Sequence, residues 1–207
     1  MQPRNLAQGK KMKWNDYIEL TEEEHLLELR GMSDFLASQS PADRHNPRVI
    51  EEMVRWQSCV SETWALKVLK KELGWKVHKN KNPKKTDLIR DDGLRIEIKF
   101  RSGIRIDSKS KSNRGNFFLE KYTHFSDDPK KSQTWLDEPK VYISVFEDGS
   151  LWVKKYQEIR QMISSGTLRN NTYCTRHDTY GHLVHWKELL SNKLLAVITG
   201  SASPVRF

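Results

Sequence analysis

The sequence predicts a mixed α/β fold, in which one mixed central sheet is flanked by helices and preceded by a helical N-terminal extension. Two observations favour this class. Apolar residues recur at helical spacing up to Gly74, and beyond it they alternate with a period of two, as in strands. The seven Trp, seven Phe and six Tyr residues of the 207-residue chain supply enough bulky side chains for a buried core.

We expect the extension to cover residues 1–48 and the main domain to cover residues 49–207. In the extension, Thr21 followed by three Glu residues is typical of a helix N-cap with acids in the first turn. Gly31 is expected to end that helix, because glycine is common just after a helix. The stretch 38–47, which contains Ser, Asn and Pro, predicts a linker before the main domain.

The main domain is predicted to begin with a long helix over residues 47–73, since Pro favours the first turn of a helix and Gly74 favours its end. Turns at 91–93 and 147–149, which contain Asp followed by Gly, predict hairpins. A second helix is predicted over residues 154–164. Strands are predicted over residues 75–78, 87–89, 94–100, 116–120, 141–146, 151–153, 182–186 and 194–199.

The composition indicates an intracellular, cytoplasmic protein. No apolar run approaches the ~18 residues of a membrane-spanning helix, and the first residues lack the apolar stretch of a secretory signal. Two cysteines, Cys59 and Cys174, cannot form a disulfide framework, which favours a reducing compartment. We therefore expect no membrane partner.

The net charge of +9 is concentrated in one segment of the chain. Residues 76–114 carry 13 Lys and Arg against five Asp and Glu, which is a net charge of +8. A concentrated basic segment attracts a polyphosphate through Coulomb forces and counterion release, so we expect a nucleic-acid partner. The alternative is a lysine-rich loop that charge keeps soluble. The candidate phosphate-binding residues are Lys79, Lys81, Lys84, Lys85, Arg101, Arg105, Lys109, Lys111 and Arg114.

A set of charged residues lies between the two basic runs. Alternation along the strand 94–100 places Glu97 and Lys99 on one face of the sheet and apolar residues on the other. A hairpin through Asp92-Gly93 brings Asp87 beside Glu97. Two carboxylates at this range repel each other unless a cation bridges them, and Mg²⁺ or Mn²⁺ prefers such oxygen ligands. The alternative is an exposed hairpin edge that carries alternating charges.

The long helix carries a carboxylate at an unexpected position. On a helical wheel, Glu62 falls at the centre of the apolar stripe that contains Leu66 and Leu69. A buried carboxylate is costly without a partner, so a metal site or a basic side chain of the sheet would explain this position. Val60 and Trp64 fall on the opposite face, and we expect them to pack against the N-terminal extension.

Together these features resemble the PD-(D/E)XK nuclease superfamily, which includes many restriction endonucleases and Holliday-junction resolvases. The resemblance covers residues 58–101, where a helix acid precedes Gly74-Trp75, then Thr86-Asp87, then Glu97-Ile98-Lys99. It continues more loosely through residues 115–120 and 140–164, as in small phage-type endonucleases. One position departs from the pattern, because Thr86 stands where the motif has Pro; this position shapes the turn and supplies no ligand.

The resemblance implies a restriction-endonuclease-like core and Mg²⁺-dependent cleavage of DNA, double-stranded or branched, with Mn²⁺ as a substitute metal. It also implies that Asp87, Glu97 and the Ile98 carbonyl bind the metal, that Lys99 is the catalytic lysine, and that Glu62 is the helix acid near the metal. Two other functions stay open, a ribonuclease of the same fold and a nucleic-acid-binding module without cleavage. The oligomeric state also stays open, a homodimer included.

Overall fold

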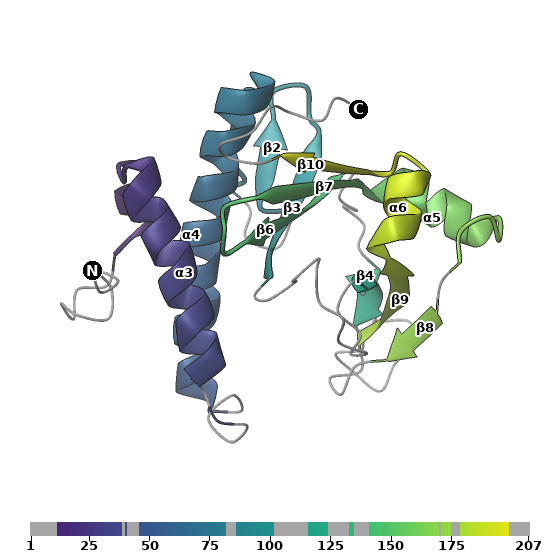
Figure 1. Cartoon of the computed structure of the whole chain (residues 1–207), viewed down its shortest axis with the longest axis horizontal. Helices are drawn as coiled ribbons and strands as arrows, with labels where there is room; N and C mark the ends of the chain where they lie inside the picture. Colours follow the sequence, from purple (N-terminus) through teal and green to yellow (C-terminus); the bar gives the residue numbers. More distant parts are fainter. Residues whose placement is uncertain are drawn as a thin grey trace.

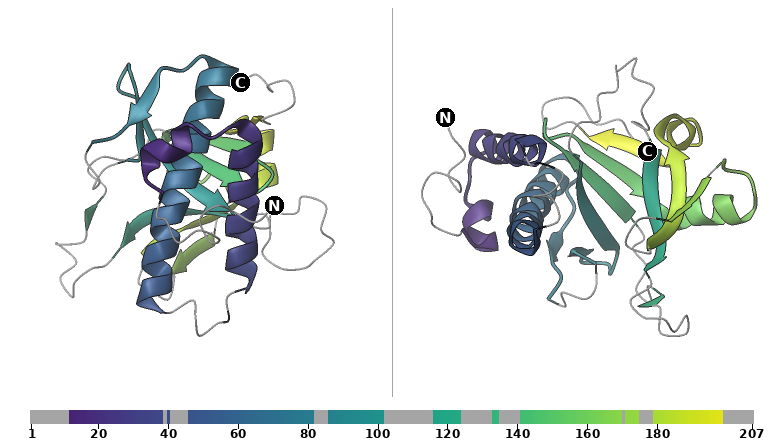
Figure 2. Two further views of the ribbon diagram at one scale, coloured as in Figure 1. Left: turned by 90° about the vertical axis from the view of Figure 1, so that its left-hand side faces the viewer. Right: turned by 90° about the horizontal axis from the view of Figure 1, so that it is seen from below.

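The computed structural model describes residues 12–38, 40, 46–81, 86–101, 116–123, 133–134, 141–169, 171–174 and 179–198. Its elements form layers, with helices on one side of a six-stranded sheet and a smaller sheet on the other side (Figure 1, Figure 2). This arrangement confirms the predicted mixed α/β class. No helix in the described part of the chain is both long and apolar enough to cross a membrane.

Three helices form the first layer: α2 (Trp14–Ile18), α3 (Glu22–Ser38) and α4 (Pro47–Leu73). The predicted cap of α3 is confirmed, because the Thr21 hydroxyl accepts from the amide of Glu24 at 3.2 Å and the Glu24 carboxylate accepts from the amide of Thr21 at 3.0 Å. The predicted end at Gly31 is wrong. Gly31 keeps a helical backbone, because burial of Leu29 and Met32 stabilises the continued helix.

The long helix α4 has the predicted bounds, and it ends where Gly74 adopts a φ of 63°. The expected packing of its outer face is also confirmed. The ring centroids of Trp64 and of His25 on α3 lie 5.3 Å apart, and the carbonyl oxygen of Val60 lies 3.0 Å from His25 Nε2. Residues of α2 and α3, such as Tyr17, belong to the same hydrophobic core as α4 and the sheet. The N-terminal helices therefore share one core with the main domain.

The first sheet is mixed. Strands β3 and β6 pair in parallel, and the other neighbours pair antiparallel. Its strands, in the order β1-β2-β3-β6-β7-β10, are β1 (Val77–Lys79), β2 (Leu88–Arg90), β3 (Arg95–Arg101), β6 (Val141–Phe146), β7 (Leu151–Lys155) and β10 (Leu195–Ile198). One face of this sheet packs on α4 through Ile96, Ile98 and Phe100 of β3. Glu97 and Lys99 alternate with these residues and lie on the other face.

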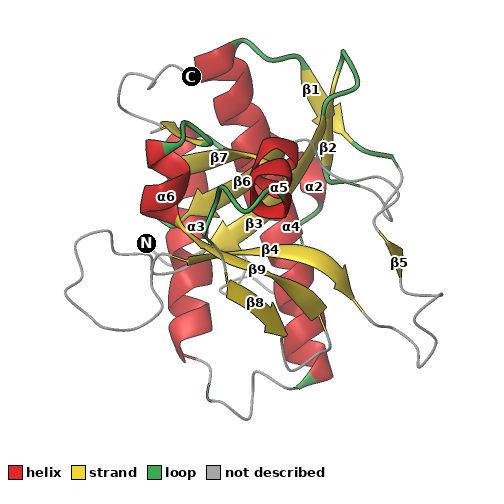
Figure 3. Ribbon diagram, turned by 90° about the vertical axis from the view of Figure 1, so that its right-hand side faces the viewer, coloured by secondary structure: helices red, strands yellow, loops and turns green. Residues whose placement is uncertain are grey.

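The expectation of one sheet is wrong, because β4 pairs with β9 in a separate four-stranded sheet (Figure 3). Its strands, in the order β5-β4-β9-β8, are β5 (Gln133–Thr134), β4 (Asn116–Thr123), β9 (Thr179–His185) and β8 (Asn171–Cys174). Helices α5 (Tyr156–Ser164) and α6 (Trp186–Ser191) follow β7 and β9. A second apolar cluster, which includes Phe146, Trp152 and Val184, joins this sheet and these helices to the first sheet.

Candidate active site

The β2–β3 hairpin brings the predicted carboxylates together. Its register pairs Leu88 with Ile96, so Asp87, directly before β2, lies level with Glu97 on β3. The turn closes because Gly93 adopts a φ of 84° and its amide donates to the Arg90 carbonyl at 2.8 Å. Local turn chemistry thus sets the register that the two carboxylates need.

Asp87 is held by the backbone of the neighbouring strand. Its Oδ2 accepts a hydrogen bond from the Ile98 amide at 2.7 Å. Burial, together with repulsion by Glu62, raises the pKa of Asp87 from 3.8 to about 6, against the opposing effects of Ile98 and of Lys99. A cation bound beside Asp87 would therefore stabilise its ionised form.

Glu97 and Lys99 form an ion pair on one face of β3, with 2.7 Å between Glu97 Oε1 and Lys99 Nζ. The alternate residues Ile96, Ile98 and Phe100 are buried in the core under α4, so the predicted alternation is confirmed. Burial disfavours the Lys99 ammonium, but neighbouring Tyr142 and Glu97 outweigh it and raise the pKa of Lys99 above its usual value. Lys99 is therefore a cation at neutral pH.

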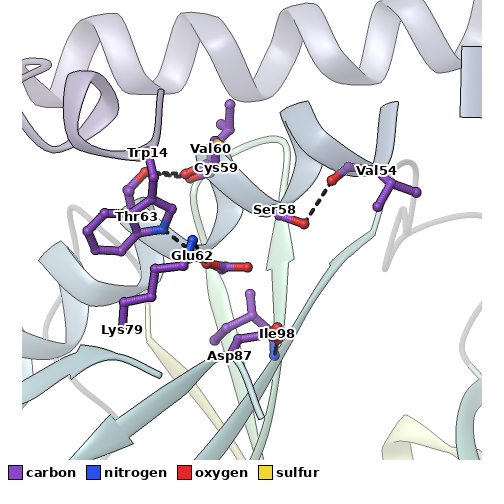
Figure 4. A network of polar contacts seen from close by, with 10 residues as sticks. All are labelled: Trp14, Val54, Ser58, Cys59, Val60, Glu62, Thr63, Lys79, Asp87 and Ile98. Atoms are coloured by element: carbon purple, nitrogen blue, oxygen red, sulfur yellow. Dashed lines mark hydrogen bonds and ion pairs between the residues drawn. The ribbon is translucent and has the colours of Figure 1, made fainter. Parts of the chain in front are cut away.

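Glu62 is buried, with 6% of its surface exposed, as its place in the apolar stripe predicted. Its Oε2 accepts from the indole Nε1 of Trp14 at 3.0 Å and lies 3.4 Å from Lys79 Nζ (Figure 4). Burial raises the pKa of Glu62, while Lys79 and Trp14 act in the opposite direction and Glu97 adds repulsion. Of the two explanations for this carboxylate, the structure therefore contains the basic partner.

The oxygen donors fit a hard divalent cation. Within the described residues, both contacts of Glu62 fall on Oε2 and the hydrogen bond of Asp87 falls on Oδ2, so one oxygen of each carboxylate accepts no hydrogen bond. The described part of the chain contains no cluster of three or more His, Cys, Asp or Glu side chains arranged for a metal. The predicted ligands, which are the carboxylates of Asp87 and Glu97 and the Ile98 carbonyl, are nevertheless the kind of sparse oxygen set that Mg²⁺ completes with waters. Metal binding stays a prediction.

The predicted phosphate-binding residues are only partly described. Lys79 and Lys81 are exposed, and Lys79 contacts Glu62 as well as the Trp14 ring, 4.9 Å from its centroid. The backbone of Arg101 ends β3, and its side chain is outside the described part. The residues that lie outside the described ranges altogether are Lys84, Lys85, Arg105, Lys109, Lys111 and Arg114.

The sequence pattern did not identify Lys154, because the helix predicted over residues 154–164 included it. The structure puts it in β7, on the same sheet face as Glu97, because Glu97 pairs with Tyr142 and Tyr142 pairs with Lys154. Lys154 is 1% exposed, and its Nζ donates to Ser144 Oγ at 2.5 Å. The signal for it was strand periodicity, because Lys154 continues the run Leu151 to Val153 and shares a face with Trp152.

Trp14 also carried no recognisable signal, because its partner Glu62 lies 48 positions further along the chain. Its contacts make the N-terminal extension part of the candidate site.

Comparison of the chain with protein-family models and with curated proteins finds no match.

Proposed function

We propose that this chain is a metal-dependent endonuclease that hydrolyses phosphodiester bonds in DNA, on a restriction-endonuclease-like core of the PD-(D/E)XK type. The supporting observation is the hairpin that sets Asp87 level with Glu97, with Lys99 paired to Glu97 on the same strand. An exposed edge with alternating charges would not raise the pKa of Asp87 to about 6, which here results from its burial and from repulsion by Glu62. These features are typical of carboxylates that serve a cation.

In this proposal Asp87, Glu97 and the Ile98 carbonyl hold Mg²⁺, and Glu62 stands behind them. The metal, when bound, supplies a Lewis acid that lowers the pKa of a water ligand and offsets phosphate charge. The Ile98 amide fixes Asp87 by its hydrogen bond to Oδ2, which leaves the other oxygen for the cation.

Lys99 has a role that follows from its charge. Because its pKa is raised, it does not accept a proton at neutral pH. It therefore stabilises negative charge on the phosphate and orients the attacking water, while Glu97 fixes its position at 2.7 Å.

DNA is the proposed substrate because of the +8 segment over residues 76–114, which leads into and out of the site strands. Incubation of the chain with supercoiled plasmid, linear duplex, branched DNA and RNA, with Mg²⁺, Mn²⁺ or EDTA, tests it. We expect metal-dependent cleavage of DNA and none in EDTA. Cleavage of RNA alone would instead indicate a ribonuclease, and binding without cleavage would indicate a binding module.

Variants of the site give the sharper test. Asp87→Ala, Glu97→Ala and Lys99→Ala should each abolish most cleavage and leave DNA affinity largely unchanged. The control is Asp92→Ala, since Asp92 lies in the same hairpin, is exposed and pairs with Arg90 at 2.6 Å. Full activity in Asp87→Ala and Glu97→Ala would remove the metal-dependent mechanism.

The basic run before Asp87 is tested through salt. Neutralising Lys81, Lys84 and Lys85 should weaken DNA binding across sequences and lower the salt slope by about one for each phosphate that the variant no longer neutralises. Neutralising Lys79 as well should also reduce cleavage, because it removes the ion pair with Glu62. An unchanged slope would mean that this run only keeps the surface solvated.

A further inference from the structure

We propose that Trp14, from the N-terminal extension, is a positioning residue of the active site, because its indole N–H fixes the carboxylate of Glu62. This role rests on the proposed nuclease function. It also gives the N-terminal extension a function, since α2 would complete a site whose other residues come from α4 and the first sheet.

Three contacts form a closed triangle around one oxygen atom. Trp14 Nε1 donates to Glu62 Oε2 at 3.0 Å, Lys79 Nζ lies 3.4 Å from the same oxygen, and Lys79 Nζ also lies 4.9 Å from the centroid of the Trp14 ring. The three residues come from α2, α4 and β1. A carboxylate with one oxygen held by two donors from different elements cannot turn freely.

The held oxygen determines what the other oxygen can do. In Figure 4 the Glu62 carboxylate lies between Trp14 and Lys79 on one side and Asp87 and Ile98 on the other. Glu62 Oε1 has no hydrogen bond within the described residues. Fixing Oε2 therefore keeps Oε1 available on the side of the hairpin. There a metal-bound water would need a hydrogen-bond acceptor, and a cation would need an oxygen ligand. Catalytic groups need placement within about 0.5 Å, which a loose carboxylate does not provide.

The extension is anchored without the indole N–H. Lys71 Nζ on α4 pairs with Glu22 at 2.6 Å, and Lys67 Nζ donates to the Leu20 carbonyl. Tyr17 and Leu20 are buried in the shared core. A substitution that removes only the Trp14 donor should therefore leave α2 in place, so that its effect reports on Glu62.

The test is Trp14→Phe, which keeps an aromatic ring under Lys79 and removes the donor. We expect kcat of DNA cleavage to fall about ten- to hundredfold, as for other groups that orient a metal-site ligand, with KM for DNA unchanged. The matched control is Trp75→Phe, because Trp75 is a half-buried Trp under Arg90 at 4.5 Å, at the opposite end of β1 from Lys79. This control should keep wild-type kcat.

A double-mutant cycle identifies the route of the effect. In a Glu62→Gln background, Trp14→Phe should cause little additional decrease in kcat, since it acts through the same carboxylate. The indole N–H resonance of Trp14, assigned by its disappearance in Trp14→Phe, should move in Glu62→Gln and stay in place in Asp92→Ala. This spectroscopic readout does not depend on cleavage.

The outcomes separate the two proposals. An active wild-type chain with unchanged kcat in Trp14→Phe, or with fully additive decreases in the cycle, overturns the role of Trp14 and leaves the nuclease proposal intact. A wild-type chain that cleaves no nucleic acid overturns the nuclease proposal and this role with it. If the indole N–H resonance of Trp14 keeps its chemical shift in Glu62→Gln, the hydrogen bond between Trp14 and Glu62 is itself overturned, whatever the activity.

Discussion

Asp87→Asn should make the metal-free protein more stable while it destroys the proposed metal site. Asp87 is ionised at pH 7 in a place where burial and Glu62 both disfavour its charge. Asn keeps the size of the side chain and an oxygen that can accept from the Ile98 amide. The neutral amide group also removes the repulsion between Asp87 and Glu62. The substitution therefore removes a cost and keeps the contact.

The pKa of Asp87 sets the magnitude. A rise from 3.8 to about 6 corresponds to about 3 kcal/mol of folding free energy that the ionised group costs. For a chain of 207 residues this predicts a Tm higher by roughly 6–12 °C in Asp87→Asn. The folded pKa is raised, so the cost is complete above pH 6. It disappears as the pH falls towards 3.8, where the folded and unfolded states are both protonated, and the two proteins should then have similar Tm values.

Thermal unfolding of both proteins between pH 4 and pH 8, in EDTA and in Mg²⁺, measures this. Mg²⁺ should raise the Tm of the wild type and leave that of Asp87→Asn unchanged. Asp92→Asn is the control with the opposite sign, because Arg90 holds the pKa of Asp92 at about 2 and its removal should destabilise slightly. A destabilised Asp87→Asn with an intact Mg²⁺ response would refute the reasoning and make Asp87 a structural residue.

Two further predictions concern stability away from the site. Burial lowers the pKa of His25 from 6.5 to about 4, so the neutral ring contributes about 3 kcal/mol of stability above pH 6.5, which is lost as the pH falls to 4. In urea unfolding, the free energy of unfolding of His25→Gln should therefore change less between pH 6.5 and pH 4 than that of the wild type. Parallel pH dependences of the two proteins would contradict this. Gly149→Ala should destabilise by more than Gly93→Ala, although both have a φ near 83°, because its Cβ would lie 2.5 Å from Leu26 and 2.9 Å from Trp64 whereas Gly93 is open. Equal decreases in stability in urea would mean that these neighbours relax without cost.

The parts of the fold that carry local signals could be predicted from the sequence. The bounds of α4 were predicted because local signals mark both ends, Pro47 at its first position and Gly74 directly after its last residue. The end of α3 was not predicted, because burial of Met32 outweighs the local preference of Gly31. The second sheet was not predicted either. It depends on the pairing of Phe117 with Val184, and strand periodicity does not reveal which distant strands are partners.

The candidate site divides in the same way. Asp87, Glu97 and Lys99 share one hairpin, so alternation and a three-residue turn were enough to place them together. The contacts of Glu62 with Trp14 and Lys79 join three elements, and only the folded chain brings these together. The helical wheel could show that Glu62 needed a partner, but it contained no information on which one.

The three carboxylates of the site differ in what balances their charge. Glu62 faces Lys79 and Trp14, and Glu97 pairs with Lys99. Within the described residues, the only hydrogen bond to the Asp87 carboxylate comes from a backbone amide. Lys79 and Lys99 act on it only at longer range, and its pKa still rises to about 6. The unbalanced negative charge of the site is thus centred on Asp87, so a cation gains most there, and the arrangement that costs stability without metal is the one that would favour binding it.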